Sequence, residues 1–222
     1  MSINPETIAQ SLQSGNLSDR LSAVNQLRSI PADVAFEMLR YPLNDDNPRV
    51  RYAAVSQLSV LGHQDLEQSL KILRNCLYYD SEIDVQAAAA DSIGALKLTE
   101  AYPDLDARFH QTQDWLLQMS IVSTLGELGD PRSFDLLIEA LASSEPLVQG
   151  SAIGSLGELR DAKAIALIQP FVTHEDWQLR YRVAQALGNI GGSEAHALLE
   201  TLRHDPMSQV ADMANVALQQ SS

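Results

Sequence analysis

A leucine or isoleucine recurs along this chain at almost constant spacing. The series is Leu27, Leu58, Ile93, Leu125, Leu156, Leu187 and Leu218, with steps of 31, 35, 32, 31, 31 and 31 residues. Similarity at a fixed period of about 20 to 50 residues is typical of repeat proteins, in which each unit buries its apolar face against its neighbours. The spacing therefore predicts an all-α α-solenoid of short helical-hairpin repeats, about seven in number. The repeats are numbered 1 to 7 in chain order, and each contains one of these seven residues.

The second helix of each repeat has the clearest pattern. It is predicted over Val50–Leu61 in repeat 2 and over Leu179–Ile190 in repeat 6. If the first apolar residue is position 0, apolar residues stand at positions 0, 4, 5, 8 and 11 in repeats 2, 4, 5 and 6. This spacing places one apolar stripe along one side of a helix, where it faces a core.

Residues at the boundaries support these helices. Residues that favour helix N-termini precede the second helices at Asn47, Glu82, Asp114, Glu145 and Asp176. Glycines that favour helix ends follow at Gly62, Gly129 and Gly191. The partner helices are predicted over Ala32–Tyr41, Leu66–Tyr79, Ser133–Ala142, Ala162–Val172 and Ser193–His204. Pro103 is expected to shorten the partner helix of repeat 3.

No linker or low-complexity stretch interrupts the repeats. The sequence therefore predicts a single repeat domain over residues 1–222, with an N-terminal cap helix within 1–16 and repeats over 17–218. The polar tail, residues 219–222, is expected to fray.

The charge and the cysteine count exclude several classes of function. A net charge of −14 disfavours binding to nucleic acids and to anionic membranes, which need a basic surface. A single cysteine, Cys76, excludes an internal disulfide, and the five histidines show no shared metal-ligand spacing. With no signal segment and no long apolar stretch, we expect a cytoplasmic protein without a metal or membrane insertion.

The runs Asn47–Ala54 and Leu125–Pro131 resemble the short HEAT-like repeat of phycobilisome lyases. The period here is shorter than the roughly 40 to 47 residues of ordinary HEAT repeats, and the tetratricopeptide and ankyrin patterns are absent. In HEAT-like arrays the second helices line the concave surface. Positions 2, 6 and 9, which lie opposite the apolar stripe and are flanked by 3 and 10, are therefore expected to line a groove.

In repeat 5 these three positions are all glycine, at Gly150, Gly154 and Gly157. Glycine within a helix costs about 1 kcal/mol relative to alanine, so some packing or binding role should compensate. One interpretation is a bare strip that a flat ligand or a partner backbone approaches closely. The alternative is a tight helix crossing, with Gly157 simply matching the Leu-Gly phrase that also contains Gly126 and Gly188.

Neighbouring repeats supply side chains with binding chemistry. Repeat 6 places Tyr181, Arg182 and Gln185 beside the glycines, and repeat 4 places Met119 there. The Arg51-Tyr52 phrase of repeat 2 parallels Arg180-Tyr181. Tyrosine combines an apolar ring with a polar tip, which suits binding surfaces, although packing over a neighbouring helix is the alternative.

Tryptophans and arginines gather where second helices begin. Trp115 and Trp177 stand two residues before position 0, where they either brace the helix start or form the rim of a ligand site. Arg51 and Arg180, at position 1, are expected mainly to pair with acidic residues of adjacent repeats. Arg182 stands outside that series and suits a carboxylate ligand.

Together with the run Glu175–Tyr181, these features resemble the phycocyanobilin lyase family of cyanobacteria. The resemblance implies binding of phycobiliproteins such as phycocyanin and allophycocyanin. It also implies that phycocyanobilin is a transient ligand rather than a permanent cofactor. The protein would either detach it from the phycobiliprotein during phycobilisome degradation or attach it. In such a reaction Asp176 would be the proton donor. Two alternatives stay open: a non-enzymatic adaptor that binds a protein on its concave face, and a bilin lyase subunit that acts with a second chain.

Overall fold

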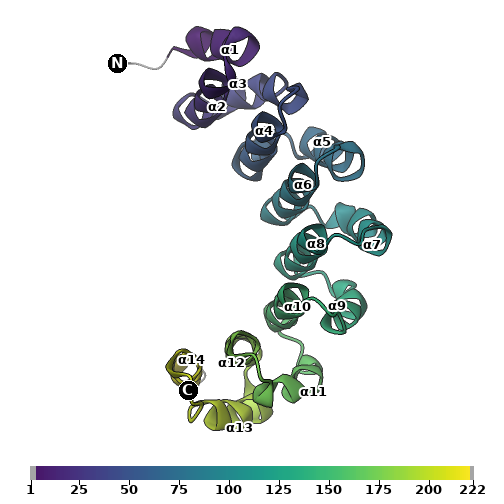
Figure 1. Cartoon of the computed structure of the whole chain (residues 1–222), viewed down its shortest axis with the longest axis vertical. Coiled ribbons are helices and arrows are strands. Elements are labelled where there is room, and N and C mark those ends of the chain that lie inside the picture. Colours follow the sequence, from purple (N-terminus) through teal and green to yellow (C-terminus); the bar gives the residue numbers. More distant parts are fainter. Residues whose placement is uncertain (1–3, 221–222) are drawn as a thin grey trace. The chain divides into compact units, whose positions relative to one another are not determined.

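The computed structural model describes residues 4–220, and all regular structure in this part of the chain is helical. The chain divides into two compact units, Met1–Ser120 and Ile121–Ser222, called here the N-terminal and the C-terminal unit (Figure 1). The division falls within α8 (Trp115–Leu128).

In the N-terminal unit, hairpins of α-helices follow one another along the chain. They are α1 (Pro5–Ser14), α2 (Leu17–Gln26), α3 (Ala32–Met38), α4 (Pro48–Leu61), α5 (Leu66–Tyr79), α6 (Ile83–Ala95), α7 (Tyr102–Gln111) and the start of α8. Short 3₁₀ helices join them at η1 (Leu27–Ser29), η2 (Pro42–Asn44), η3 (Gly62–Gln64) and η4 (Thr99–Ala101).

The C-terminal unit repeats the same arrangement after the end of α8. Its helices are α9 (Ser133–Leu141), α10 (Pro146–Leu159), α11 (Ala164–Ile168), η5 (Gln169–Thr173), α12 (Trp177–Ile190), α13 (Gly192–Leu202) and α14 (Ser208–Gln220). The second helices stack on one another, α4 on α6 in one unit and α10 on α12 on α14 in the other. Each unit is therefore a stack of helical hairpins, which confirms the prediction of an all-α solenoid fold.

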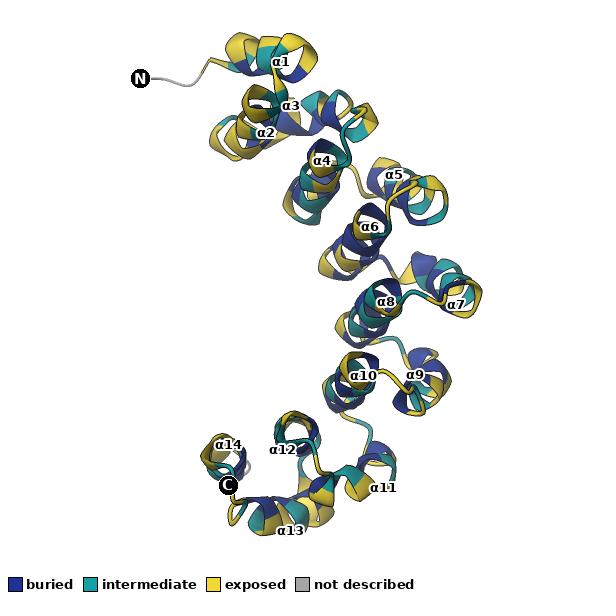
Figure 2. Ribbon diagram, viewed as in Figure 1, coloured by how far each residue is buried: buried dark blue, intermediate teal, exposed yellow. Residues whose placement is uncertain are grey.

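The core of each unit lies between the apolar stripes of its second helices and the buried faces of their partner helices (Figure 2). Six of the seven leucine and isoleucine residues that define the period are fully buried, and Leu218 of α14 is nearly so. Burial of such a side chain contributes roughly 2 kcal/mol to folding, so the periodic residues hold each hairpin to the next.

Two partner helices differ from their predicted course. The helix predicted over Ala162–Val172 is divided into α11 and η5, because Pro170 has no N–H to continue the α-helical bonding. Pro103 stands in the first turn of α7, where a missing N–H costs nothing, and α7 still extends over 10 residues.

The ends of the chain are described only in part. The segment predicted as a cap, residues 1–16, contains α1, and residues 1–3 lie outside the described part. In the tail, Gln219 and Gln220 belong to α14, while Ser221 and Ser222 are not described. That residues 1–222 form one repeat domain stays a prediction.

Candidate functional site

The side of the second helices opposite the core is partly open, as the helical wheel predicts. Tyr52, Ser56 and Val60 follow one another along α4 at positions 2, 6 and 10. The Tyr52 side chain is 48% exposed and Val60 is 65% exposed, while Ser56 is half-buried. On α12, Arg182 and Asn189 are exposed at positions 3 and 10. These positions therefore form the surface of each unit that is available to a ligand.

Position 9 does not belong to this surface, which corrects the sequence prediction. A Cβ atom on Gly157 would lie 2.6 Å from Cα of Ala186, at position 7 of the next repeat. Gly126 faces Ser155 and Gly188 faces Ala217 in the same way. The glycine at position 9 therefore allows two stacked helices to approach closely, which was the alternative interpretation for Gly157.

The other two glycines of α10 are different. A Cβ on Gly154 would have no atom within 4 Å, so this residue faces open space. A Cβ on Gly150 would lie 3.4 Å from Cδ2 of Leu179 and 3.9 Å from Cγ of Arg182. The aliphatic stem of Arg182 thus lies beside Gly150, and no packing contact accounts for glycine at position 154.

The polar side chains of α12 stand next to these glycines. The guanidinium of Arg182 is exposed and donates one hydrogen bond of 3.2 Å to the side-chain oxygen of Gln185. Tyr181 and Gln185 are half-buried. The structure therefore brings Gly150, Arg182 and Gln185 together, but Gly150 is buried beside Leu179 and Arg182, and of these two glycines of α10 Gly154 alone faces open space. We call this surface, with Tyr181, the α10–α12 strip.

The start of α12 places Trp177 and Asp176. Trp177 is the first residue of the helix and is half-buried. A carboxylate oxygen of Asp176 accepts the backbone N–H of Gln178 over 2.8 Å and so caps the helix. This bond leaves the other carboxylate oxygen of Asp176 available at the helix start.

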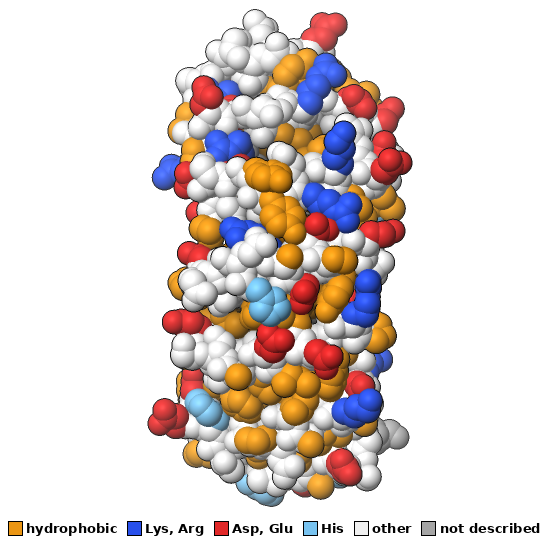
Figure 3. All heavy atoms as spheres, turned by 90° about the vertical axis from the view of Figure 1, so that its right-hand side faces the viewer, with side chains coloured by type: hydrophobic (Ala, Val, Ile, Leu, Met, Phe, Trp, Pro, Cys, Tyr) orange, Lys and Arg blue, Asp and Glu red, His pale blue; other side chains and the backbone are white. Residues whose placement is uncertain are grey.

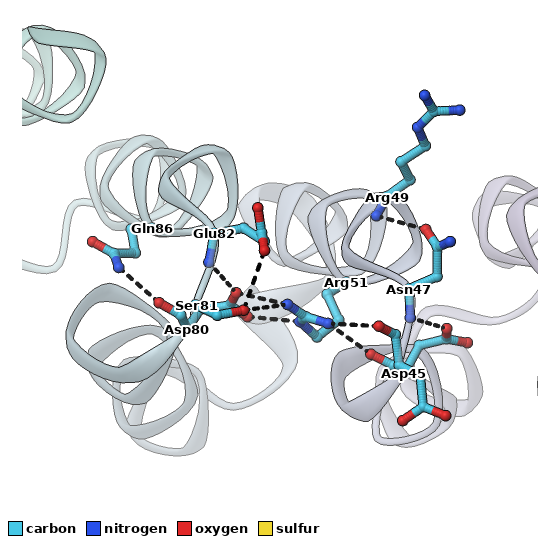
Figure 4. A network of polar contacts seen from close by, with 9 residues as sticks. Asp45, Asn47, Arg49, Arg51, Asp80, Ser81, Glu82 and Gln86 are labelled. Atoms are coloured by element: carbon cyan, nitrogen blue, oxygen red, sulfur yellow. Dashed lines mark hydrogen bonds and ion pairs between the residues drawn. The ribbon is translucent and has the colours of Figure 1, made fainter. Parts of the chain in front are cut away.

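Arg51 is held in a polar network at the start of α4 (Figure 4). Its Nε and Nη2 donate to the carboxylate of Asp80 over 2.8 and 2.9 Å, and Nη1 donates to the carbonyl oxygen of Asp45 over 2.9 Å. Burial raises the pKa of Asp80, but the hydrogen bonds from Arg51 and from the Glu82 N–H lower it more, so its net pKa is below the usual value. Arg51 therefore joins neighbouring repeats, as its position suggests.

Arg180 makes the equivalent contacts in the C-terminal unit. Its Nε and Nη2 donate to Asp205 over 2.6 and 2.9 Å, and Nη1 donates to the carbonyl oxygen of His174 over 2.7 Å. The hydrogen bond with Arg180 holds the pKa of Asp205 below its usual value. Arg51 and Arg180 thus each pair with an acidic residue of an adjacent repeat, as predicted. We call this series of contacts made by position 1 the ladder.

Sequence reasoning missed the amide members of this ladder. In repeats 3, 4 and 5, which have glutamine at position 1, the glutamine amide donates to a carbonyl oxygen of the preceding loop or, for Gln149, of the last residue of α9. The bonds are 2.7 Å from Gln86 to Asp80, 3.2 Å from Gln118 to Thr112 and 3.2 Å from Gln149 to Leu141. The signal was present, because position 1 carries a long side chain with N–H donors in all these repeats.

The remaining predicted residues lie in the N-terminal unit. Met119 is half-buried on α8, and Trp115, the first residue of that helix, is exposed. Tyr52 lines a depression of about 470 Å³ between the starts of α4 and α6, together with Pro48, Arg49, Glu82, Asp84 and Val85.

Among the described residues, these surfaces carry neither a group of side chains placed to hold a metal ion nor an exposed thiol. Within residues 4–220, no group of three His, Cys, Asp or Glu side chains is placed to hold a metal ion. Cys76 is buried in α5, and burial raises the pKa of its thiol to about 11. On the face drawn in Figure 3, acidic, basic and hydrophobic side chains all lie at the surface. In the same described part, no helix has the length and apolarity needed to cross a membrane.

Comparison with known proteins identifies the repeat. The model of HEAT repeats matches residues 5–90, 70–149 and 135–219. No curated protein matches the sequence.

Three solved structures show the same fold at low identity. The complex of CpcE and CpcF of phycocyanin lyase from Nostoc sp. PCC7120 is 22% identical, with a TM-score of 0.65 over 100% of this chain and 96% of that one. YibA of Escherichia coli is 14% identical, with a TM-score of 0.62 over 98% and 93% of the two chains. An engineered protein is 19% identical, with a TM-score of 0.59 over 99% and 68%. At these identities the likeness establishes the fold alone.

Proposed function

This chain belongs to the HEAT-repeat family, and on that premise we propose that it is a cytoplasmic factor that binds phycobiliproteins and detaches their phycocyanobilin. In this role it is most like the phycobilisome degradation protein NblB. The fold likeness to the CpcE–CpcF phycocyanin lyase supports the choice of ligand, because that likeness extends over the whole chain.

The observation that carries the proposal is the α10–α12 strip. Gly154 has open space in front of it, and Arg182, whose stem lies beside Gly150 on the same helix as Gly154, has an exposed guanidinium whose one hydrogen bond goes to an amide. A linear tetrapyrrole is flat and bears propionate groups. A bare helix surface suits the first property, and a guanidinium suits the second.

Each residue of the strip has its own proposed role. Arg182 and Gln185 bind a propionate, the ring of Tyr181 lies against the pyrroles, and Gly154 lets the chromophore approach the helix, while Gly150 makes room for the stem of Arg182. Trp177 forms the rim at the start of α12. Tyr52 and Met119, in the N-terminal unit, are assigned to the surface that meets the carrier protein, while Arg51 holds the start of α4 in place through Asp80 and Asp45.

Detachment needs no oxidant or reductant. The C–S bond of the thioether breaks, a proton leaves the carbon next to the former C–S carbon, and a double bond forms between these two carbons of the bilin. The carrier cysteine leaves as a thiolate. The carboxylate of Asp176 is proposed to take the proton that leaves the carbon and to donate it to this thiolate, so that no proton is gained or lost. The protein promotes the step by holding the bilin in a strained conformation.

Absorbance spectra test the proposal directly. The purified chain is mixed separately with holo-phycocyanin and with free phycocyanobilin. We expect a complex with holo-phycocyanin, a change in its visible spectrum and transfer of bilin out of the carrier. If neither a complex nor a spectral change is seen with holo-phycocyanin, the proposal is wrong.

Matched variants assign the effect to the strip. The double variant Tyr181→Ala, Arg182→Ala removes the ring and the guanidinium without touching the Arg180 ladder. Arg203→Ala removes an exposed arginine from the end of α13, where it pairs only with Glu200 three residues earlier. The double variant should lose the spectral change and Arg203→Ala should keep it. Equal behaviour of the two would place the interface elsewhere.

A second candidate is an adaptor without chemistry, and the capping role of Asp176 favours it, because a helix-capping carboxylate needs no catalytic explanation. An adaptor forms the complex with holo-phycocyanin and leaves its spectrum unchanged. A lyase subunit would instead attach phycocyanobilin to apo-phycocyanin, and only after its second chain is added. The same spectra therefore separate all three functions.

A further inference from the structure

The depression beside Tyr52 has a chemistry of its own. It lies within the N-terminal unit, has a volume of about 470 Å³, and is formed where the first turns of α4 and α6 stand side by side. Its apolar wall comes from Pro48, the Tyr52 ring and Val85. The Tyr52 side chain is 48% exposed, so an aromatic face is available to a ligand rather than packed into the core.

Two carboxylates stand on the α6 side of this depression. Glu82 and Asp84 are both exposed, and in the described part of the chain no cation pairs with Asp84. Glu82 accepts only a long hydrogen bond of 3.4 Å from the hydroxyl of Ser81. Arg51 is near enough to interact electrostatically with Glu82, but its hydrogen bonds go to Asp80 and to loop carbonyls.

Arg49 is the one basic side chain among the lining residues. Its side chain extends away from the Arg51 network in Figure 4, while its backbone N–H donates to Asn47. As a positive charge on the same depression, it disfavours a cationic ligand there. In the whole N-terminal unit, acidic residues outnumber lysine and arginine by 16 to 9, so the field around the depression is negative.

We infer that the depression receives an arginine side chain of a protein partner, with the guanidinium over the Tyr52 ring and between the carboxylates of Glu82 and Asp84. An aromatic face with nearby carboxylates is the pair of features that attracts a guanidinium, and the mouth is open enough for a side chain on a folded surface. The inference rests on the proposed function only in taking the partner to be a protein. The depression would thus fix a basic point of the carrier at the N-terminal unit.

Peptide titration of the full chain tests this inference without any bilin. Three blocked pentapeptides are used, each with four glycines around a central arginine, norleucine or glutamate. Tyrosine ring signals are followed by NMR in protein with ¹³C-labelled tyrosine, and the Tyr52→Phe variant assigns the Tyr52 signal. We expect the arginine peptide to shift the Tyr52 signal in a saturable way and the other two peptides to leave it unchanged.

Substitutions around the depression should change the affinity for the arginine peptide in opposite directions. Tyr52→Ala, followed through backbone amide signals, should weaken binding of the arginine peptide about two- to five-fold, the usual size for an exposed cation–π contact. Asp84→Asn should also weaken it, whereas Arg49→Ala should strengthen it by removing a positive charge. Glu67→Gln removes the same charge from an exposed site on α5 and is the matched control, with no expected effect.

Two results overturn the inference. One is the absence of any Tyr52 shift with the arginine peptide. The other is reversed signs, with the glutamate peptide binding and Arg49→Ala weakening it, which would make the depression an anion site. Because no probe contains a bilin, either failure leaves the phycocyanin spectra to be judged separately, and a failure of those spectra leaves the peptide result standing.

Discussion

The two Arg-Tyr phrases of this chain occupy the same positions in two repeats and have different surroundings. Arg51 and Arg180 do the same work, each joining a carboxylate of the next repeat to a carbonyl of the preceding loop. The tyrosines that follow them differ. Tyr52 lines an open depression together with two carboxylates, whereas Tyr181 is half-buried and is followed by the exposed Arg182, whose stem lies beside Gly150 of α10.

The comparison of the two Arg-Tyr pairs shows that the arginine holds neighbouring repeats together and that the tyrosine belongs to the variable surface. Position 1 points into the loop between repeats, so its chemistry is the same wherever the ladder is built. Position 2 differs in exposure from repeat to repeat: Tyr52 is exposed, Tyr181 is half-buried and Gly150 is buried. One repeat sequence therefore presents a negative aromatic site in the N-terminal unit and a basic, flat one in the C-terminal unit.

Removal of the ladder arginine is the change with the largest expected effect. Arg180→Ala leaves the carboxylate of Asp205 with its side chain 5% exposed and without its partner. Loss of one partner from a buried pair costs about 3 kcal/mol, so the free energy of unfolding measured in urea should fall by about that amount. Arg51→Ala should cost a similar amount, because Asp80 is left in the same position.

Arg182→Ala is the control for this prediction, since it removes an exposed arginine two residues away. It should change the free energy of unfolding by less than about 0.5 kcal/mol. The comparison requires that Arg180 holds the repeats together and that Arg182 is a surface residue. If both variants lose the same free energy of unfolding, this distinction is wrong.

Gly157→Ala should have the next largest effect. Its new Cβ would lie 2.6 Å from the Ala186 Cα, which is backbone and moves only if α10 and α12 separate. Overpacking of this kind costs about 1 to 3 kcal/mol. Urea unfolding measures the loss. A variant as stable as the wild type would contradict the assignment of position 9 to helix crossing.

Acid should weaken the ladder in a predictable direction. The pKa of Asp205 is lower in the folded protein than in the unfolded chain, so its pairing stabilises the fold above the unfolded-state value of about 3.9 and is lost as the pH falls through the folded value. The difference in unfolding free energy between wild type and Arg180→Ala should therefore be constant from about pH 7 to pH 5 and shrink below about pH 4. The part of this difference that depends on pH should be smaller than the total loss of unfolding free energy in Arg180→Ala.

Urea unfolding at a series of pH values measures that difference. Arg203→Ala, which breaks an exposed pair with Glu200, serves as the control and should show a small difference at every pH. A difference for Arg180→Ala that grows in acid would contradict the sign argued here.

The fold was predictable because the signal repeats. Leu58, Leu125 and Leu187 each mark the centre of a buried stripe, and their spacing carries the period without any knowledge of contacts. Position 9 was misplaced because a helical wheel treats one helix alone, whereas here each second helix has another stacked on its flank. The recurrence of glycine at 126, 157 and 188 was the available clue.

The candidate site was predictable only in part. The wheel predicts Tyr181, Arg182 and Gln185 on the open side of one helix, and in the structure Arg182 is exposed while Tyr181 and Gln185 are half-buried. The depression beside Tyr52 depends on how far apart the starts of α4 and α6 stand, and on which acidic residues the loop before α6 supplies. Spacing within one helix contains no such information, so Glu82 was interpreted only as a residue at a helix start.

Gly154→Ala is the smallest change and the sharpest test of the C-terminal surface. The new methyl group meets no atom within 4 Å and the backbone is helical, so the variant should be more stable in urea by about 0.5 to 1 kcal/mol. Gly154→Leu, which fits the same open space, should fold and yet lose the spectral change with holo-phycocyanin, because its side chain covers the strip. Full activity in Gly154→Leu would mean that the glycine serves no ligand, and the contrast between the two tyrosine surfaces would then rest on Arg182 alone.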